Sequence, residues 1–228
     1  MMRTWISHHR ASERMPRHRH TEGYGAVVLA GGYVEAGDRG RYRARPGQVV
    51  IHGAYEAHQD YFSNLGAVVL NIPISNKLEA ATGTVADSDA IARLAERDMI
   101  AAAELLEETL QPSNAQLTDW PDKLAAALAS RHVFAIEEWA ADMGLAPQSI
   151  SRGFRQAYGV SPKRYRAEQR TLRAIRHLHT WRGTLAALAT ESGFADQGHF
   201  TRAVVALTGV TPHRLRVKSV QEGARVCS

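Results

Sequence analysis

In the C-terminal part of the chain, hydrophobic positions recur with the period of an α-helix, and glycine interrupts the pattern. Within residues 184–216 an apolar run stops at Gly193, because glycine can adopt the turn conformation that other residues avoid. A second periodic run follows, with Asp196 placed to cap its first turn, and it ends at Gly209. Pro212 then favours the start of one more helix. This region therefore predicts two short helices joined by a tight turn.

The same arrangement occurs once more upstream, in residues 136–166. Gly144 and Gly159 are 15 positions apart, and the corresponding glycines of the downstream copy are 16 apart. This match in spacing indicates an internal duplication. Between the copies, an arginine-rich stretch from Pro162 to His179 keeps leucine and isoleucine on one side, which predicts a long helix.

Residues 122–218 resemble the DNA-binding domain of the AraC/XylS type of bacterial transcription regulator. The downstream copy reads A-x(2)-S-G-F-A-D-x(2)-H-F-T-R followed by G-V-T-P-x(2)-L-R. The upstream copy agrees with the family at Ala140, Gly144, Arg152, Phe154, Gly159, Ser161, Pro162 and Tyr165. The resemblance implies an all-α domain in which a long helix joins two helix-turn-helix units. It also implies binding to double-stranded DNA through two reading helices about 34 Å apart.

The polar face of each expected reading helix supplies the candidate DNA contacts. Arginine pairs well with guanine, and glutamine with adenine, in the major groove. The candidates for base contact are Gln148, Ser149, Ser151, Arg152, Gln197, His199 and Arg202. The candidates for phosphate contact are Arg155, Lys163 and Arg164, with Arg214 or Arg216. Arg152 and Arg202 are also compatible with structural salt bridges.

Residues 18–74 alternate short apolar runs with glycine, proline and aspartate clusters, which predicts antiparallel strands in a small barrel or sandwich. The predicted strands are Gly25–Ala30, Tyr33–Ala36, Gly40–Ala44, Gln48–Ile51 and Ala67–Ile74. The order His18, His20, Glu22, then Pro46-Gly47, then His58 resembles a cupin half-barrel over residues 10–75. That module is the usual sensing domain of the family named above. The predicted fold is therefore multidomain, with a cupin-like all-β barrel followed by an all-α domain.

His18 and His20 are expected to point to the same side of one strand, because side chains alternate along a strand. The cupin resemblance implies that His18, His20 and His58 either bind a divalent metal or line the pocket of a small-molecule effector without one. We favour the second interpretation and expect no cofactor. The candidate ligand-binding residues are then His18, His20, Glu22, Tyr24 and His58.

For the other histidine and aromatic residues of this region, the sequence supports less specific predictions. His8, His9 and His52 have no partner at a useful spacing, and we expect them at the surface. An apolar pocket wall and a hydrophobic core are equally compatible with Tyr24, Tyr55, Tyr61 and Phe62.

The middle of the chain predicts a helix from about Ala90 to Leu110, capped by Asp87-Ser88-Asp89. Its apolar stripe suits either packing on the barrel or the seam of a homodimer. The segment from Gln111 to Pro121 breaks the pattern and predicts an interdomain linker. The predicted division is a sensing domain at 1–80, a helical connector and linker at 81–121, a DNA-binding domain at 122–218 and a tail at 219–228.

The charge distribution and the cysteine content limit the binding partners and the cellular compartment that we expect for this protein. The chain has 228 residues and a net charge of +5. Residues 76–129 hold 4 basic and 10 acidic residues, whereas 130–228 hold 15 basic and 7 acidic residues, which is typical of a nucleic-acid-binding module beside an acidic connector. Cys227, the only cysteine, excludes an internal disulfide. Because neither a membrane-spanning run nor a secretory signal is found, we expect a cytoplasmic protein.

These patterns together predict a transcription regulator that binds DNA, responds to a small-molecule effector, forms a homodimer and contacts RNA polymerase. No enzymatic activity is expected. Two alternatives stay open. A cupin-type metalloenzyme with a helical scaffold predicts tightly bound metal and substrate turnover, and a regulator without an effector predicts no thermal shift with small molecules.

Overall fold

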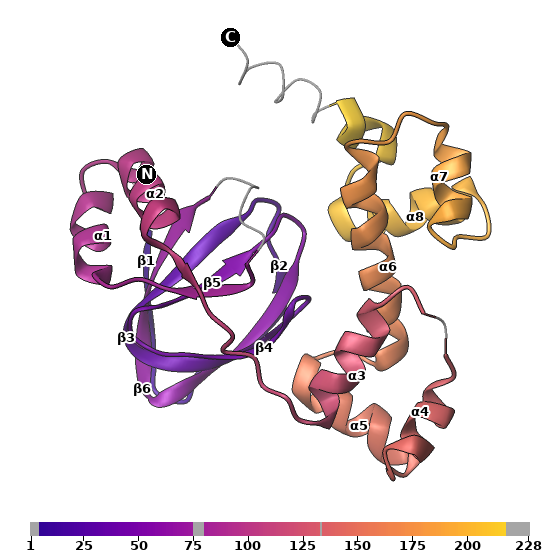
Figure 1. Ribbon diagram of the computed structural model, residues 1–228, viewed down its shortest axis with the longest axis horizontal. Helices are drawn as coiled ribbons and strands as arrows, with labels where there is room; N and C mark the ends of the chain where they lie inside the picture. The colour runs from indigo at the N-terminus through magenta and orange to yellow at the C-terminus, as the bar shows by residue number, and fades with distance from the viewer. Residues whose placement is uncertain (1–4, 75–79, 133, 218–228) are drawn as a thin grey trace. The chain divides into compact units, whose positions relative to one another are not determined.

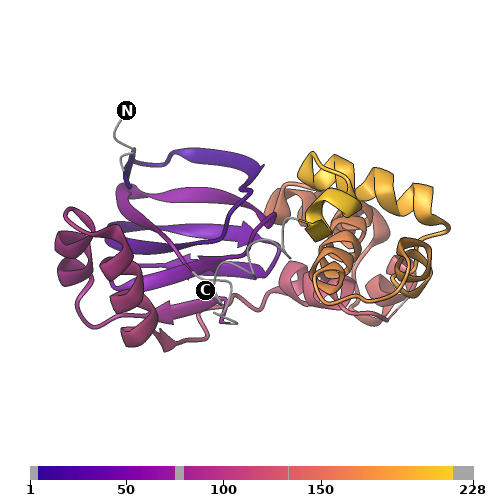
Figure 2. The same cartoon turned by 90° about the horizontal axis from the view of Figure 1, so that it is seen from above.

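Two compact units make up the computed structural model, which describes residues 5–74, 80–132 and 134–217 (Figures 1 and 2). The first unit comprises residues 1–126 and 134–160, and the second comprises 127–133 and 161–228. This division by contacts differs from the expected boundary at residue 122, which stays a prediction. Cys227 and the expected tail at 219–228 lie outside the described residues.

The first unit is built on an antiparallel sheet in the order β1-β6-β3-β5-β7-β8, with β2 paired to β6 and β4 paired to β3. Its strands are β1 (Ile6–His9), β2 (Arg14–Arg19), β3 (Tyr24–Gly37), β4 (Gly40–Ala44), β5 (Gln48–His52), β6 (Ala57–Pro73), β7 (Thr82–Thr84) and β8 (Gln111–Pro112). The long strands β3 and β6 pair along most of their length and form the centre of the sheet. The strand pairings among the described residues are all antiparallel, as the short apolar runs predicted.

Side chains along β3 alternate between two hydrophobic clusters, because successive residues of a strand point to opposite faces. Val27 belongs to the cluster covered by α1 (Ser88–Ala95) and α2 (Met99–Thr109), where Ile91 and Leu106 are buried. Ala26 and Val28 belong to the cluster on the other face of the sheet. The sheet therefore has a helix-covered face and a second face that carries the pocket described below.

Two sequence predictions about these elements are wrong. The two strands predicted on either side of Gly31 are one continuous strand, β3, with a shift in register at that point. Gly31 has a φ of +69°, and a Cβ there would lie 2.1 Å from the carbonyl oxygen of Gly66, so only glycine fits this irregularity. The single helix predicted from Ala90 is broken, because Asp98 accepts hydrogen bonds from the amides of Ile100 and Ala101 and caps a new helix.

The segment predicted as a linker begins along the edge of the sheet. Its first residues form β8, in which Pro112 pairs with Gly83 of β7. Farther along, the amide of Leu117 donates a hydrogen bond of 2.7 Å to the carbonyl of Arg41 on β4. These bonds fix the path of residues 111–117 along the sheet, so this part of the segment is not a free connector.

Three helices follow the sheet: α3 (Trp120–Ala129), α4 (Ile136–Asp142) and α5 (Pro147–Tyr158). We call α4 and α5 the first helix pair. Gly144 forms their turn with a φ of +66°, and Phe154 and Tyr158 of α5 are fully buried. The hydroxyl of Tyr158 donates a 2.9 Å hydrogen bond to Asp122, which also accepts from the guanidinium of Arg41. The first helix pair is therefore bonded to the sheet's unit by buried polar groups.

The second unit contains α6 (Pro162–Leu178), α7 (Leu185–Glu191) and α8 (Gln197–Thr208), followed by helical residues 212–217. We call α7 and α8 the second helix pair. The carboxylate of Asp196 accepts a 2.6 Å hydrogen bond from the amide of His199, and Gly193 and Gly209 both have positive φ. The caps and turns predicted for this pair are thus confirmed. Phe194 is buried beneath the guanidinium of Arg170, 4.5 Å from its ring centroid.

Candidate functional site

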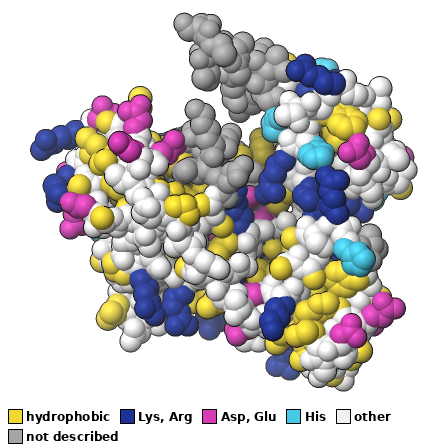
Figure 3. Space-filling view, viewed as in Figure 1, with side chains coloured by type: hydrophobic (Ala, Val, Ile, Leu, Met, Phe, Trp, Pro, Cys, Tyr) yellow, Lys and Arg dark blue, Asp and Glu magenta, His cyan; other side chains and the backbone are white. Residues whose placement is uncertain are grey.

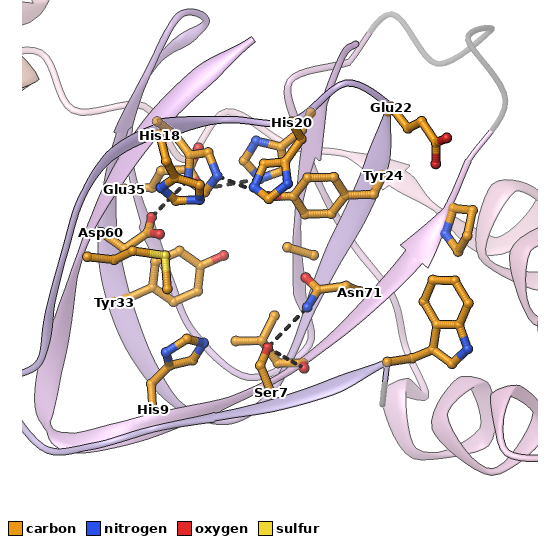
Figure 4. Close-up of a pocket in the computed structure, with 18 of the residues that line it drawn as sticks. Ser7, His9, His18, His20, Glu22, Tyr24, Tyr33, Glu35, Asp60 and Asn71 are labelled. Atoms are coloured by element: carbon orange, nitrogen blue, oxygen red, sulfur yellow. Dashed lines mark hydrogen bonds and ion pairs between the residues drawn. The ribbon is translucent and has the colours of Figure 1, made fainter. Parts of the chain in front are cut away.

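A pocket of about 430 Å³ opens on the face of the sheet that α1 and α2 leave uncovered. Figure 4 shows His18, His20, Glu35 and Asp60 on one side of it and Ser7, His9 and Asn71 on the other. The amide of Asn71 donates a 3.0 Å hydrogen bond to the hydroxyl of Ser7. Apolar lining comes from Trp5, Met15, Ala26, Phe62, Val69 and Pro73. A cavity of this size with a few convergent polar groups suits a small molecule.

The structure brings together four of the five predicted ligand-binding residues. The rings of His18 and His20 lie 4.8 Å apart, and His18 lies 4.3 Å from His58, centroid to centroid. The hydroxyl of Tyr24 is 3.0 Å from Nε2 of His58. Glu22 lines the pocket but lies apart from the imidazoles (Figure 4).

Two histidines predicted at the surface belong to the pocket, so that part of the sequence prediction is wrong. His52 is 4% exposed and stacks on Tyr24 with ring centroids 4.4 Å apart. His9 stacks on Phe62 at 3.9 Å. Both reach the pocket because β1 and β5 run beside the central strands, a pairing that spacing along the chain does not reveal. His8 is exposed, as expected.

Sequence reasoning also missed two buried acids in the pocket, Glu35 on β3 and Asp60 on β6. Oε2 of Glu35 lies 3.4 Å from Nε2 of His52 and 3.7 Å from Nδ1 of His58. Asp60 lies 3.2 Å from Nδ1 of His58. The alternation of side chains along a strand could have revealed Asp60, because it lies two positions after His58 and therefore points to the same face of the sheet.

Burial shifts the pKa values of several ionisable side chains that line the pocket. It lowers the pKa of His20 to about 4, with a smaller contribution from nearby His58. Burial and His58 also lower the pKa of His18. Burial lowers the pKa of His52 to about 4 and raises the pKa of Glu35 to about 8, although His58 opposes the latter shift. At neutral pH His18, His20 and His52 are therefore mostly uncharged, and Glu35 is mostly protonated.

Of the remaining aromatic candidates, Phe62 lines the pocket, whereas Tyr55 and Tyr61 do not. Tyr61 lies on β6 between two residues that face the pocket, and its hydroxyl lies 3.4 Å from the carbonyl oxygen of Gln156 on α5. Gln59 of the same strand donates a 2.9 Å hydrogen bond to the carbonyl of Ala157. One side of β6 therefore carries pocket residues, and the other side holds the last turn of α5.

The candidate DNA contacts lie on accessible surface. The exposed ones are Gln148, Ser149, Ser151, Arg152, Arg155, Lys163, Arg164, Gln197 and Arg202. His199 is half-buried, with its ring edge-on to Phe194 at 5.3 Å. Within the described residues, neither Arg152 nor Arg202 forms a salt bridge. Arg164 pairs with Glu168 at 2.8 Å.

Lys and Arg side chains gather over α6 in the view of Figure 3. Burial, with Arg131 nearby, lowers the pKa of Arg173 on this helix. Like charges so close together repel one another, and a bound polyanion would relieve that repulsion. Among the helices that the structure describes, none is long and apolar enough to cross a membrane.

Comparisons with known proteins agree with this arrangement. A helix-turn-helix domain model matches residues 139–218. The arabinose operon regulatory protein of Escherichia coli (strain K12) is 31% identical over 166 residues, which are 71% of this chain and 53% of that protein. Its counterpart in Salmonella typhimurium is 29% identical over 163 residues, 71% of this chain and 55% of that protein. The chain thus spans about half the length of the curated relatives it matches.

A solved structure gives a weaker likeness. ToxT from Vibrio cholerae, bound to an unsaturated fatty acid, aligns with 92% of this chain and 93% of its own, at 13% identity and a TM-score of 0.43. The match to the helix-turn-helix model extends from Trp139 in α4 through α8 and so includes both glycine turns. The chain is therefore similar to regulators of the AraC type, most specifically in its helix-turn-helix region.

Proposed function

We propose that this protein is a sequence-specific DNA-binding transcription regulator whose DNA affinity depends on a small molecule bound in the sheet's pocket. One observation carries the proposal: β6 holds pocket residues His58 and Asp60 on one side and α5 on the other. A ligand that moves His58 therefore also acts on the strand to which a reading helix is bonded.

In this proposal both helix pairs are helix-turn-helix units, and α5 and α8 each enter a major groove. Arg152 and Gln148 contact bases from α5, and Gln197 and Arg202 do so from α8, assisted by Ser149, Ser151 and His199. Arg155, Lys163 and Arg164 bind phosphates and set the position on the duplex without reading its sequence. The accessible, largely polar surfaces of α5 and α8 support these assignments.

The effector site is a cupin-like pocket in which His18, His20, Tyr24 and His58 hydrogen-bond a polar ligand and Glu22 borders its entrance. Burial lowers the pKa of His18 and His20, and uncharged imidazoles donate and accept hydrogen bonds without the desolvation cost of a buried charge. The apolar side of the pocket supplies contact area. This chemistry favours a neutral, hydroxyl-rich molecule as the effector.

The remaining features of the proposal concern assembly. Ile100 on α2 is 75% exposed and would be covered in a contact between α2 and another protein surface. We assign that contact to a second copy of the chain, giving a homodimer. The proposal also includes a contact with RNA polymerase and a cytoplasmic location, as for a regulator that acts on the chromosome.

Selection from random duplex DNA tests the DNA-binding part. The full-length chain, at near-physiological salt, should enrich a motif with two separate elements. Loss of Arg152 should relax one element, and loss of Arg202 the other. Absence of any enriched sequence would contradict the proposal.

Thermal unfolding with a panel of neutral pentoses and hexoses, beginning with arabinose because of the relatives' names, tests the sensing part. A compound that stabilises the protein should do so less in the His20→Gln variant and should change DNA affinity. A ligand that binds the pocket without any change in DNA affinity would contradict the coupling.

A further inference from the structure

Glu35 from β3, His52 from β5 and His58 from β6 converge on one point in the pocket, with ligand atoms within 4.8 Å of one another, and Asp60 of β6 lies beside His58. Each of the four is 5% exposed or less. Three distances join them: 3.4 Å from His52 Nε2 to Glu35 Oε2, 3.7 Å from His58 Nδ1 to the same oxygen, and 3.2 Å from His58 Nδ1 to Asp60. Ligand atoms around a tetrahedral ion lie about 3.3 Å apart, given bonds of about 2.0–2.1 Å.

Two of these atoms have unmet hydrogen-bonding capacity. Oε2 of Glu35 and Nε2 of His52 are buried, and neither has a hydrogen-bond partner among the described residues. Buried polar atoms without a partner are rare and costly in folded proteins. Here the two face each other across 3.4 Å, so a cation between them would satisfy both.

The strand register adds a second, independent reason. Glu35 and Asp60 are direct partners in the β3–β6 pairing, which places two acids side by side in the interior. Like charges at directly opposed positions destabilise a sheet. Either protonation or a bound cation removes this repulsion, and a cation also uses the two imidazoles that lie beside the acids.

We infer that Glu35, His52 and His58 bind one divalent first-row transition-metal ion, with Asp60 beside them. His52 coordinates through Nε2 and His58 through Nδ1. The hydroxyl oxygen of Tyr24, 3.0 Å from Nε2 of His58, accepts a hydrogen bond from that nitrogen and leaves the Nδ1 lone pair for the ion. Two nitrogen donors and one carboxylate suit Zn²⁺, Fe²⁺, Ni²⁺ or Mn²⁺.

This donor set differs from the His18, His20 and His58 trio that the cupin resemblance implied. The trio's ligand atoms also lie within 4.8 Å of one another, but the trio contains no carboxylate, and Glu22 lies apart from it (Figure 4). Nδ1 of His18 is already 3.0 Å from the carbonyl of Pro16. Because His58 belongs to both sets, variants of His52 and His20 separate them.

The experiment uses the full-length protein after treatment with a chelator, and it needs no DNA, so its outcome is independent of the proposed regulatory function. Cobalt(II) is titrated while visible absorption reports its coordination, and Zn²⁺ is then added in competition. We expect one ion per chain. His52→Gln should weaken binding roughly tenfold or more, whereas His20→Gln and the exposed control His8→Gln should keep the wild-type affinity.

Glu35→Gln provides a second variant in case His52→Gln does not fold, which circular dichroism will reveal. It keeps the size of the side chain and removes the anionic ligand, so it too should weaken binding. A wild-type protein that binds no cobalt or zinc at stoichiometric concentrations would overturn the inference. The inference would also be overturned if His20→Gln lost metal binding while His52→Gln kept it. That result would assign the ion to His18, His20 and His58.

Discussion

The two helix pairs share their glycine turns, but different neighbours hold the second helix of each. The last turn of α5 accepts a hydrogen bond from Gln59 of β6, and Tyr158 bonds the buried Asp122. In contrast, α8 packs against α6 and α7. One copy of a duplicated motif is therefore built into the unit that contains the pocket, and the other is built into a helical unit. The comparison teaches that the same sequence pattern can be held in two ways, by bonds to a sheet in the first helix pair and by packing on other helices in the second.

The exposed surfaces of the two reading helices differ as well. Two arginines, Arg152 and Arg155, are exposed on α5, whereas Arg202 is the only arginine on α8. Val205 of α8 is 37% exposed. Charge-assisted contacts to phosphate and guanine are the strong ones in DNA recognition. We therefore expect α5 to contribute more to DNA affinity than α8.

The largest effects should come from truncating the central aromatic residue of each pair. Phe154→Ala and Phe200→Ala each remove a fully buried ring and should lower the free energy of unfolding by about 3–5 kcal/mol. Amide hydrogen exchange should show that the two substitutions destabilise different elements. Phe154→Ala should increase exchange in β6 as well as in α5, and Phe200→Ala only in the second unit.

Leu65→Ala is the matched control, because Leu65 is 82% exposed and its truncation should change stability by about 0.5 kcal/mol or less. If Phe154→Ala left exchange in β6 at the wild-type rate, the mechanical link between the first helix pair and the sheet would be refuted. Neither helix pair would then affect the stability of the sheet.

A smaller effect is expected from the arginines at the DNA surface. Arg152→Ala and Arg202→Ala should each weaken binding to the selected site by about 1–3 kcal/mol and relax specificity at one position. A stabilising pocket ligand should change the cost of Arg152→Ala but not that of Arg202→Ala. Fluorescence anisotropy with matched and mismatched duplexes measures both. Equal weakening on every sequence would show that these arginines anchor the backbone instead.

Local signals predicted the helix pairs well because caps and turns depend on neighbouring residues. Asp196 caps α8 within one turn, and Gly193 has the backbone conformation that its position required. The pocket was predicted only in part. Grouping His52 with Glu35 depends on the pairing of β3 with β5 and β6, and the bond from Gln59 to Ala157 joins residues 98 positions apart. Such contacts follow from register and packing, which hydrophobic periodicity in one sequence does not specify.

Gln59→Ala tests the coupling itself. It removes the hydrogen bonds to the carbonyl of Ala157 and to the hydroxyl of Tyr61 and should lower the free energy of unfolding by about 1–3 kcal/mol. DNA affinity without a ligand should stay near the wild-type value, while the change produced by a pocket ligand should shrink. Gln111→Ala, at an exposed position, is the control. A full ligand response in Gln59→Ala would show that β6 does not transmit the signal.

The smallest effect should come from the residue after the proline that closes each pair. The segments Gly159-Val160-Ser161-Pro162-Lys163 and Gly209-Val210-Thr211-Pro212-His213 correspond, so a lysine in one copy stands where the other has a histidine. Lysine carries a fixed positive charge at neutral pH, whereas histidine changes its charge near that pH. Lys163→Ala should therefore weaken all duplexes alike and reduce the dependence of log affinity on log salt by about one, with less change for His213→Ala. Equal salt dependence in the two variants would mean that both copies hold the backbone equally, which would leave the bond to the sheet as the feature that distinguishes them.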